Sequence, residues 1–189
     1  MKNLFVVFYY PFFWIKFLIR IFIKNSEMRI LIFHNINPKH KKKLIDFIKH
    51  IKKSWTILDP ENYLEFTKSK HVPSGRYLMI SFDDGFKTNK EIANLLRIEF
   101  KIKAIFFILS KFIKINDKRL SLDFARKKIK NYEVNINNLS TNDLLEILNN
   151  GHKIGSHTCN HAELSKLKHN DLNFELVESK RYLENNFNI

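Results

Sequence analysis

The sequence predicts an α/β protein whose strands form a parallel sheet or a barrel. Short apolar runs alternate along the chain with segments of helical periodicity. These runs are too continuously apolar for a sheet that has one solvated face. The predicted strands cover residues 29–33, 77–82, 103–109 and 152–157. Since parallel strands end at one edge of a sheet, the polar residues that follow them are expected to share a site.

Helices are predicted between these strands from turn residues and apolar spacing. Pro38 opens a basic helix that runs to about residue 54, and Pro60 opens a shorter helix to about residue 69. A weak strand is predicted at 57–58, and a further helix at 88–99. The first half of the chain therefore alternates strand and helix.

The second half contains a segment with a weaker pattern. Residues 110–139 are polar and rich in Asn and Lys, so they are predicted to form an insertion with one helix near 122–129. Ser140 or Thr141 caps a helix that ends before Gly151. A last helix is predicted over 170–184, after the fourth strand.

Composition and charge exclude several classes of protein. The 189 residues suffice for one domain with a sizeable core. Cys159 is the single cysteine, which excludes a disulfide scaffold and a multi-thiolate zinc site. The net charge is +14, yet the basic residues are spread along the chain and no base-stacking or helix-turn-helix motif accompanies them. We therefore expect no nucleic-acid partner, and a solvated face explains the basic helix after Pro38 more simply than a lipid or nucleic-acid site.

The N-terminal segment, residues 1–27, is expected to lie at a membrane interface. Residues 4–23 are apolar apart from Lys16 and Arg20, which share one helical face with Lys24. A transmembrane span is an alternative, and the positive-inside rule would then leave the rest of the chain in the cytoplasm. A buried helix of a soluble protein is another. The favoured expectation is membrane association on the cytoplasmic side.

Two adjacent carboxylates follow the second strong strand. Asp83 and Asp84 stand directly before Gly85, which permits a tight turn. Neighbouring carboxylates repel each other, and a bound cation offsets that repulsion. Side chains diverge where a strand enters a loop, so one carboxylate can bind a metal while the other stays free. A plain turn or a helix cap is the alternative explanation of this motif.

Two histidines follow the last strand at a spacing of four residues. His157 and His161 would lie on the same side of one helical turn, close enough to bind one ion. Two ordinary surface histidines are the alternative. Together the two motifs offer one carboxylate and two imidazoles, which suits Zn²⁺ but also Fe²⁺, Co²⁺, Ni²⁺ or Mn²⁺. The remaining carboxylate would deprotonate water at the metal, which points to metal-assisted hydrolysis of an acyl group.

The two motifs, in this order and context, resemble those of the polysaccharide deacetylases (carbohydrate esterase family four, the nodulation-factor deacetylase homology domain). The second motif reads GHKIGSHTCNH, and the likeness covers about residues 28–189. The resemblance implies a distorted (β/α) barrel that removes N-acetyl groups from amino sugars of a cell-envelope polysaccharide. It implies that Asp83 is the general base and that Asp84, His157 and His161 hold a divalent metal, with zinc favoured.

The resemblance also suggests two supporting residues. Thr158 would support the turn of the second motif. The segment LIFHNI is similar to the first-strand Tyr-His-x-Ile of cell-surface glycan deacetylases, with Phe33 in place of Tyr. A structural role at the barrel end is expected for His34 as readily as any catalytic one.

Several motifs of the resembled family find no counterpart before Ile189. These are a Pro-Tyr segment that supplies an oxyanion donor, an Asp and a Trp that orient the base and wall the pocket, and a Leu-x-His that carries the general acid. The expectation is therefore the N-terminal part of a deacetylase domain with its C-terminal strands missing. Since loss of one oxyanion donor costs about 100- to 1000-fold in rate, we expect little activity from this chain alone. A separate chain could supply the missing motifs, and a non-catalytic glycan- or metal-binding remnant is the alternative.

Overall fold

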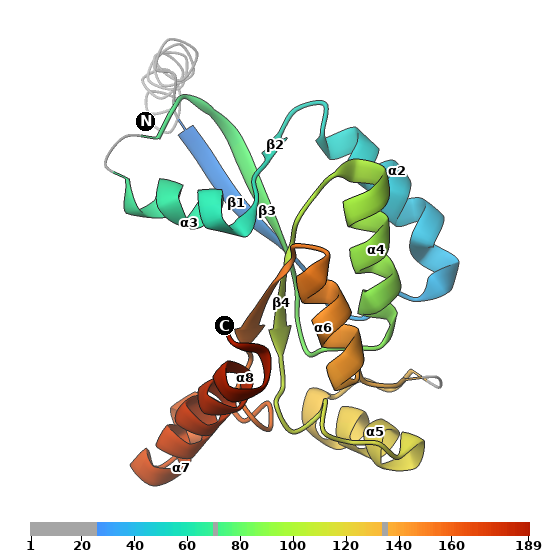
Figure 1. Cartoon of the computed structure of the whole chain (residues 1–189), viewed down its shortest axis with the longest axis vertical. Coiled ribbons are helices and arrows are strands. Elements are labelled where there is room, and N and C mark those ends of the chain that lie inside the picture. The colour runs from blue at the N-terminus through green and yellow to red at the C-terminus, as the bar shows by residue number, and fades with distance from the viewer. Residues whose placement is uncertain (1–25, 70–71, 134–135) are drawn as a thin grey trace, which may run out of the picture.

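A parallel sheet forms the centre of the molecule (Figure 1). The computed structural model describes residues 26–69, 72–133 and 136–189. The strand order is β1-β3-β4-β5, and β2 pairs with the first half of β3. Every pairing is parallel, so the predicted class is confirmed. The strands are β1 (Ser26–Phe33), β2 (Thr56–Ile57), β3 (Gly75–Phe82), β4 (Ile105–Ile108) and β5 (Lys153–Ser156).

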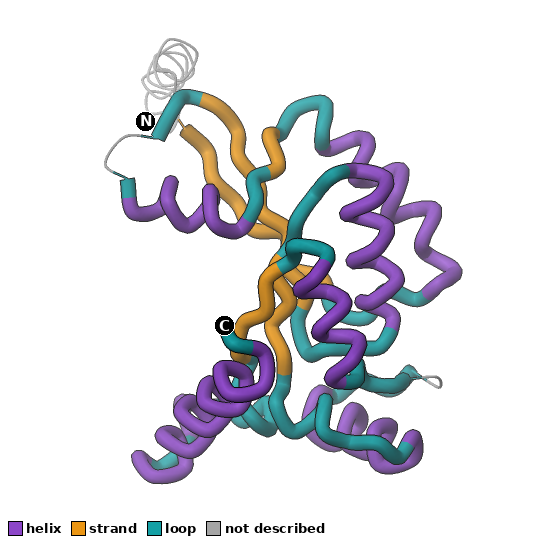
Figure 2. The backbone as a smooth tube through the Cα atoms, viewed as in Figure 1, coloured by secondary structure: helices purple, strands orange, loops and turns teal. Residues whose placement is uncertain are grey.

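Helices connect these strands, as the alternation in the sequence predicts (Figure 2). The predicted helix from Pro38 to about residue 54 is shorter, because a 3-10 turn precedes it and it ends at Ile51. The helices are α2 (Lys41–Ile51), α3 (Pro60–Lys68), α4 (Thr88–Phe100), α5 (Lys118–Phe124), α6 (Thr141–Asn149), α7 (His169–Asn173) and α8 (Ser179–Phe187). None of these described helices has both the length and the hydropathy of a membrane span.

The expected membrane-interface segment falls almost wholly outside the described residues. Residues 1–25 are not described, and Ser26 and Glu27 already belong to β1. The first strand therefore begins at Ser26, three residues before its predicted start at residue 29. The interface prediction for residues 1–27 stays a prediction.

The main core lies between the sheet and a row of helices formed by α2, α4 and α6 (Figure 1). Aromatic side chains cross the sheet within it: Phe82 stacks on Phe33 at 5.4 Å and on Phe106 at 5.0 Å between ring centroids. Leu96 of α4 and Ile80 of β3 are fully buried. Burying this apolar surface is what fixes the strand ends relative to one another.

The first strand is less buried than its apolar sequence predicts. Ile30 is 44% exposed and Ile32 is 57% exposed. The prediction of a buried strand at 29–33 is therefore wrong for the face of the strand that carries these two side chains. The reason is position: β1 is the terminal strand of the described sheet and pairs only with β3.

The insertion at 110–139 has a small core of its own. Its helix begins at Lys118, earlier than the predicted 122, and continues into a π-helical turn, Ala125–Ile129. Five buried residues hold the insertion to the end of β4: Phe86, Leu109, Phe112, Ala125 and Ile136. The insertion is therefore packed next to the strand ends, where α5 appears in Figure 1.

Candidate metal centre

The end of β3 places the two adjacent carboxylates. Asp83 N–H donates to Phe33 O at 2.8 Å, and Gly85 N–H donates to Asp83 O at 3.0 Å, which closes a tight turn. The backbone is left-handed at Asp84 (φ 75°) and at Gly85 (φ 89°). Asp accepts this conformation more readily than most residues, and Gly does so at no steric cost. The Asp84 side chain is fully buried as a result.

The two histidines lie on an irregular loop after β5. The prediction that one helical turn places them together is wrong, because the backbone is left-handed at Thr158 (φ 73°) and at His161 (φ 57°). His157 N–H donates to Ile108 O at 2.9 Å and so continues the pairing of β5 with β4. His161 N–H donates to Thr158 Oγ1 at 3.2 Å across the turn. The two rings still lie close together, with centroids 5.2 Å apart and planes tilted by 55°.

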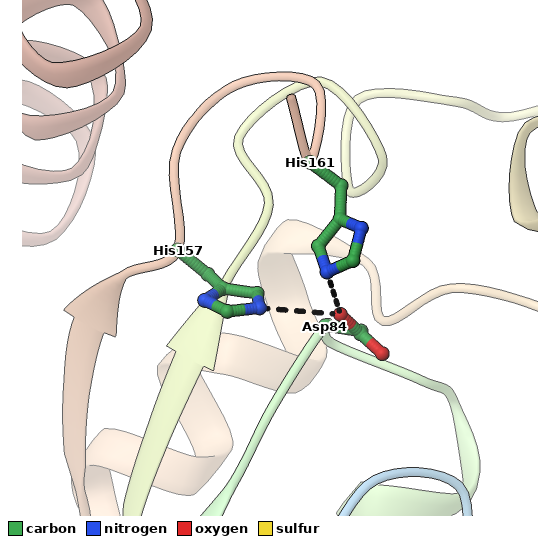
Figure 3. A group of neighbouring side chains, drawn as sticks. All are labelled: Asp84, His157 and His161. Carbon is green, nitrogen blue, oxygen red and sulfur yellow. Dashed lines mark ion pairs between the residues drawn. The ribbon is translucent and has the colours of Figure 1, made fainter. Parts of the chain in front are cut away.

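Both imidazoles point at the same oxygen of Asp84 (Figure 3). The Nε2 atoms of His157 and His161 lie 3.5 Å and 3.7 Å from Asp84 Oδ1. One ligand atom from each residue lies within 4.8 Å of the others. Within the described residues, neither oxygen of Asp84 accepts a hydrogen bond, although both are buried. Because an unpaired buried carboxylate is costly, a divalent cation fits this position well.

The insertion orients one of the two rings. His161 Nδ1 lies 3.2 Å from Lys128 O, in the π-helical turn after α5. A carbonyl oxygen only accepts, so His161 Nδ1 donates to it, and in the neutral ring this leaves the Nε2 lone pair for a cation. The carboxylate of Asp84 in turn raises the pKa of His157 above its ordinary value, mainly through a direct contact that outweighs burial.

The second carboxylate stays outside this cluster of ligand atoms. Asp83 is half-buried, and its Oδ1 accepts no hydrogen bond from the described residues. Burial raises the pKa of the Asp83 carboxyl, although His157 and His34 oppose the shift. A carboxylate that has a raised pKa and lies beside a candidate metal centre has the properties of a general base.

A cleft of about 440 Å³ opens beside Asp84. His34, which follows β1, lines it, and so does the 129–133 segment of the insertion. Asn35 holds this wall in place: its Nδ2 donates to Glu133 Oε2 at 2.7 Å, and Thr88 Oγ1 donates to its Oδ1 at 2.6 Å. This wall was not predicted from the sequence. The one local signal for it was the polar pair His34-Asn35 at the end of the first strand.

A parallel α/β sheet whose strand ends carry a carboxylate and two imidazoles defines a protein with a candidate metal centre. The model of the polysaccharide deacetylase family matches residues 70–189, which is more than half of the chain. The chain therefore belongs to the polysaccharide deacetylase family.

One curated relative and two solved structures agree with this membership. The Bacillus subtilis protein YxkH, which carries the name of a polysaccharide deacetylase, is 26% identical over 173 residues. That match covers 87% of this chain and 54% of YxkH, so this chain spans about half of the relative's length. The deacetylase PplD of Streptococcus pyogenes, solved with acetate, gives a TM-score of 0.63 at 17% identity and covers 86% of this chain and 69% of PplD. IcaB from Ammonifex degensii gives 0.63 at 13% identity, with 87% and 71% covered. At these identities the two structures show the shared fold.

Proposed function

We propose that this protein is a metal-dependent hydrolase that removes N-acetyl groups from amino sugars of a cell-envelope polysaccharide. The observation that carries the proposal is the convergence of Asp84, His157 and His161 next to a second carboxylate, at the side of a cleft. Family membership supports the polysaccharide as substrate class. Cys159 is buried and is the one cysteine of the sequence. A metal site built from several thiolates is therefore excluded.

Each residue has a distinct task in this proposal. Asp84, His157 and His161 would hold the cation, for which zinc is the favoured choice. A bound divalent cation polarises an amide carbonyl and makes water a stronger acid. Asp83 would take the proton of the attacking water, because its carboxylate is not a member of the ligand cluster. Thr158 would keep the loop turned through its contact with His161 N–H.

The wall of the cleft supplies the features of a sugar-binding surface. Tyr132 is 70% exposed at the edge of the cleft and offers a flat apolar ring on which a sugar can stack. Asn131 and Glu133 flank it with amide and carboxylate groups that suit hydroxyls. We propose that this segment contacts the polysaccharide and that His34 borders the same subsite.

We further propose that this chain of 189 residues, acting alone, catalyses deacetylation slowly. Among the described strands, β1 and β5 each leave one edge unpaired, so the sheet is open on both sides. A second chain that paired with an open edge could add an acid or an oxyanion donor beside the cleft. A second candidate function is a glycan- or metal-binding protein without turnover, because Asp84, His157 and His161 could hold a cation without any acid or oxyanion donor.

The experiment that tests the function is a paired binding and activity assay on the full chain. Zn²⁺ binding is measured first, and acetate release from an N-acetylglucosamine oligomer is measured next, with Asp83→Asn as the variant. We expect Zn²⁺ to bind both proteins, with slow acetate release that the variant abolishes. Absence of Zn²⁺ binding would contradict the metal centre. Rapid release would contradict impaired turnover, and binding with no release would favour the non-catalytic function.

We also propose membrane association on the cytoplasmic side, through the pattern of apolar and basic residues in 1–27. Co-sedimentation with vesicles that contain anionic lipid tests it. We expect binding that is lost when residues 1–25 are removed. Equal binding of the shortened chain would contradict the proposal.

A further inference from the structure

The helix that follows the metal-binding loop presents a buried carboxylate to that loop. α7, a π-helical turn (Phe174–Glu178) and α8 form one continuous helical stretch. Glu175 lies in the π turn and is 4% exposed. Its Oε2 accepts the N–H groups of Cys159 at 2.9 Å and of Asn160 at 2.8 Å. Its Oε1 accepts the side-chain amide of Asn160.

These donors all come from between the two histidines. Cys159 and Asn160 are the middle of the segment that joins His157 to His161. Burying a carboxylate is costly unless several donors meet it, and here one loop supplies them all. The hydrogen bonds from Asn160 hold the pKa of Glu175 below its ordinary value although burial opposes them, so the group stays ionised at neutral pH.

The loop needs support of this kind because its backbone is strained. Two of its non-glycine residues, Thr158 and His161, have positive φ, a conformation that is unfavourable for L-residues unless surrounding contacts stabilise it. A second contact ties the same elements together, since the hydroxyls of Ser156 and Ser179 lie 2.6 Å apart. π-helical turns are rare in proteins, and those that occur lie often at functional sites. This π-helical turn carries Glu175.

We propose that Glu175 is a positioning residue for the metal centre. Its carboxylate fixes the loop between His157 and His161, so that both imidazoles face Asp84 before a cation binds. This inference rests on the proposed function, in which Asp84, His157 and His161 hold the cation. Glu175 itself does not reach the cation, because its contacts are with the loop backbone and with Asn160.

The test compares three variants of the full chain in Zn²⁺ titrations against a competing chelator. Glu175→Leu removes every acceptor at similar size, and Glu175→Gln keeps one neutral acceptor oxygen. Glu178→Gln is the matched control, because Glu178 lies in the same π turn and contacts Arg181 at the surface. The visible spectrum of bound Co²⁺ reports the ligand geometry independently of catalysis, and circular dichroism reports folding.

We expect Zn²⁺ affinity to fall about 10- to 100-fold in Glu175→Leu, the range typical of residues that orient metal ligands, with an altered Co²⁺ spectrum. We expect a smaller loss, about 5-fold, in Glu175→Gln, because a neutral acceptor binds N–H groups less strongly. Glu178→Gln should bind as the unmodified chain does.

The outcomes separate this inference from the proposed function. If the unmodified chain binds no Zn²⁺, the proposed metal centre fails and the inference fails with it. If the unmodified chain binds and folded Glu175→Leu binds equally well, the inference alone is overturned. Should Glu175→Leu not fold, Glu175→Gln decides: an affinity within 2-fold of the unmodified chain overturns the inference, and a larger loss with native circular dichroism supports it.

Discussion

The carboxylate and the imidazoles of the candidate metal centre are held in different ways. Asp84 stands at the end of β3, and its turn is fixed by the pairing to β1 and by backbone hydrogen bonds, among them Leu139 N–H to Gly85 O at 2.8 Å, to residues of the main core. The histidines stand on an irregular loop that is held by groups outside the main core. Those groups are Glu175 in the helix that follows and the carbonyl of Lys128 in the insertion.

This contrast predicts which substitutions should weaken metal binding and which should weaken the fold. The strand end is part of the main core, so altering Asp84 should change metal binding while the fold persists. The loop is held by contacts from two peripheral elements, so damage to either element should reach the histidines. Four substitutions test this contrast.

Asp84→Asn should have the largest effect on the metal centre. We expect Zn²⁺ affinity to fall by more than the roughly 100-fold that marks loss of an outer partner. Zinc at 100 times its Kd should stabilise the unmodified chain by about 2.7 kcal/mol and should leave the variant unchanged. Thermal unfolding with and without Zn²⁺ or a chelator measures both effects.

The same variant should be more stable than the unmodified chain when no metal is present. It replaces a buried carboxylate that lacks hydrogen bonds, and Asn tolerates the left-handed backbone at this position. We expect a gain of about 1–3 kcal/mol at pH 8. Lower stability without metal would show that Asp84 supports the fold, against the contrast drawn here.

Phe112→Ala should damage the support of His161. Phe112 is fully buried, stacks on Phe124 at 5.2 Å and meets Phe86 edge-on at 5.8 Å. We expect a loss of about 3–5 kcal/mol in urea unfolding and a weaker Zn²⁺ affinity, since the turn that carries Lys128 packs in this cluster. Leu120→Ala, at an exposed position of α5, should change stability by less than about 0.5 kcal/mol. Unchanged affinity in folded Phe112→Ala would separate the insertion from the metal centre.

His152→Leu should weaken the anchor of β5 and change its dependence on pH. His152 Nδ1 accepts Ala104 N–H at 3.0 Å, and Nε2 lies 3.0 Å from Ala93 O. Burial lowers the pKa of His152 from its ordinary 6.5, so the neutral ring belongs to the folded state. Its contribution is therefore complete above about pH 6.5 and is lost as pH falls below that value.

We expect His152→Leu to cost about 1–3 kcal/mol at pH 8 and less at pH 5, because protonation already weakens the unmodified chain there. Denaturant unfolding at both pH values measures the difference. An equal cost at both values would contradict the assignment of a neutral buried ring.

Apart from the control Leu120→Ala, Ser140→Ala should have the smallest effect. Ser140 Oγ accepts Asp143 N–H at 3.3 Å, and Asp143 Oδ2 accepts Ser140 N–H at 2.8 Å, which makes a capping box at the start of α6. We expect a loss of about 0.5–2 kcal/mol in unfolding free energy and unchanged Zn²⁺ affinity. A change in affinity would show that the metal centre senses the main core as strongly as it senses the loop.

The regular part of the molecule could be predicted from sequence because its signals are local. The runs that became β3 and β4 are rich in apolar and aromatic residues, and Ser140 is followed three residues later by an acidic side chain. The clustering of Asp84 with His157 and His161 followed from polar residues at parallel strand ends.

The remaining features depend on contacts that no local pattern carries. The loop at Thr158 and His161 is not helical, because the carboxylate of Glu175 stabilises a different backbone. The exposure of Ile32 follows from its place at a sheet edge, which sequence spacing does not encode. The small core of the insertion could not be predicted from the sequence, because its apolar residues are far apart along the chain and meet only after the chain folds back.

X-ray absorption spectroscopy at the zinc edge of the Zn²⁺-loaded chain tests whether Asp84, His157 and His161 hold the cation. These residues should give nitrogen and oxygen ligands only, with two imidazoles at about 2.0–2.1 Å. The nearby Cys159 makes the opposite result visible, because a thiolate would appear at about 2.3 Å. A sulfur ligand, or a spectrum without two imidazoles, would contradict a centre built from Asp84, His157 and His161.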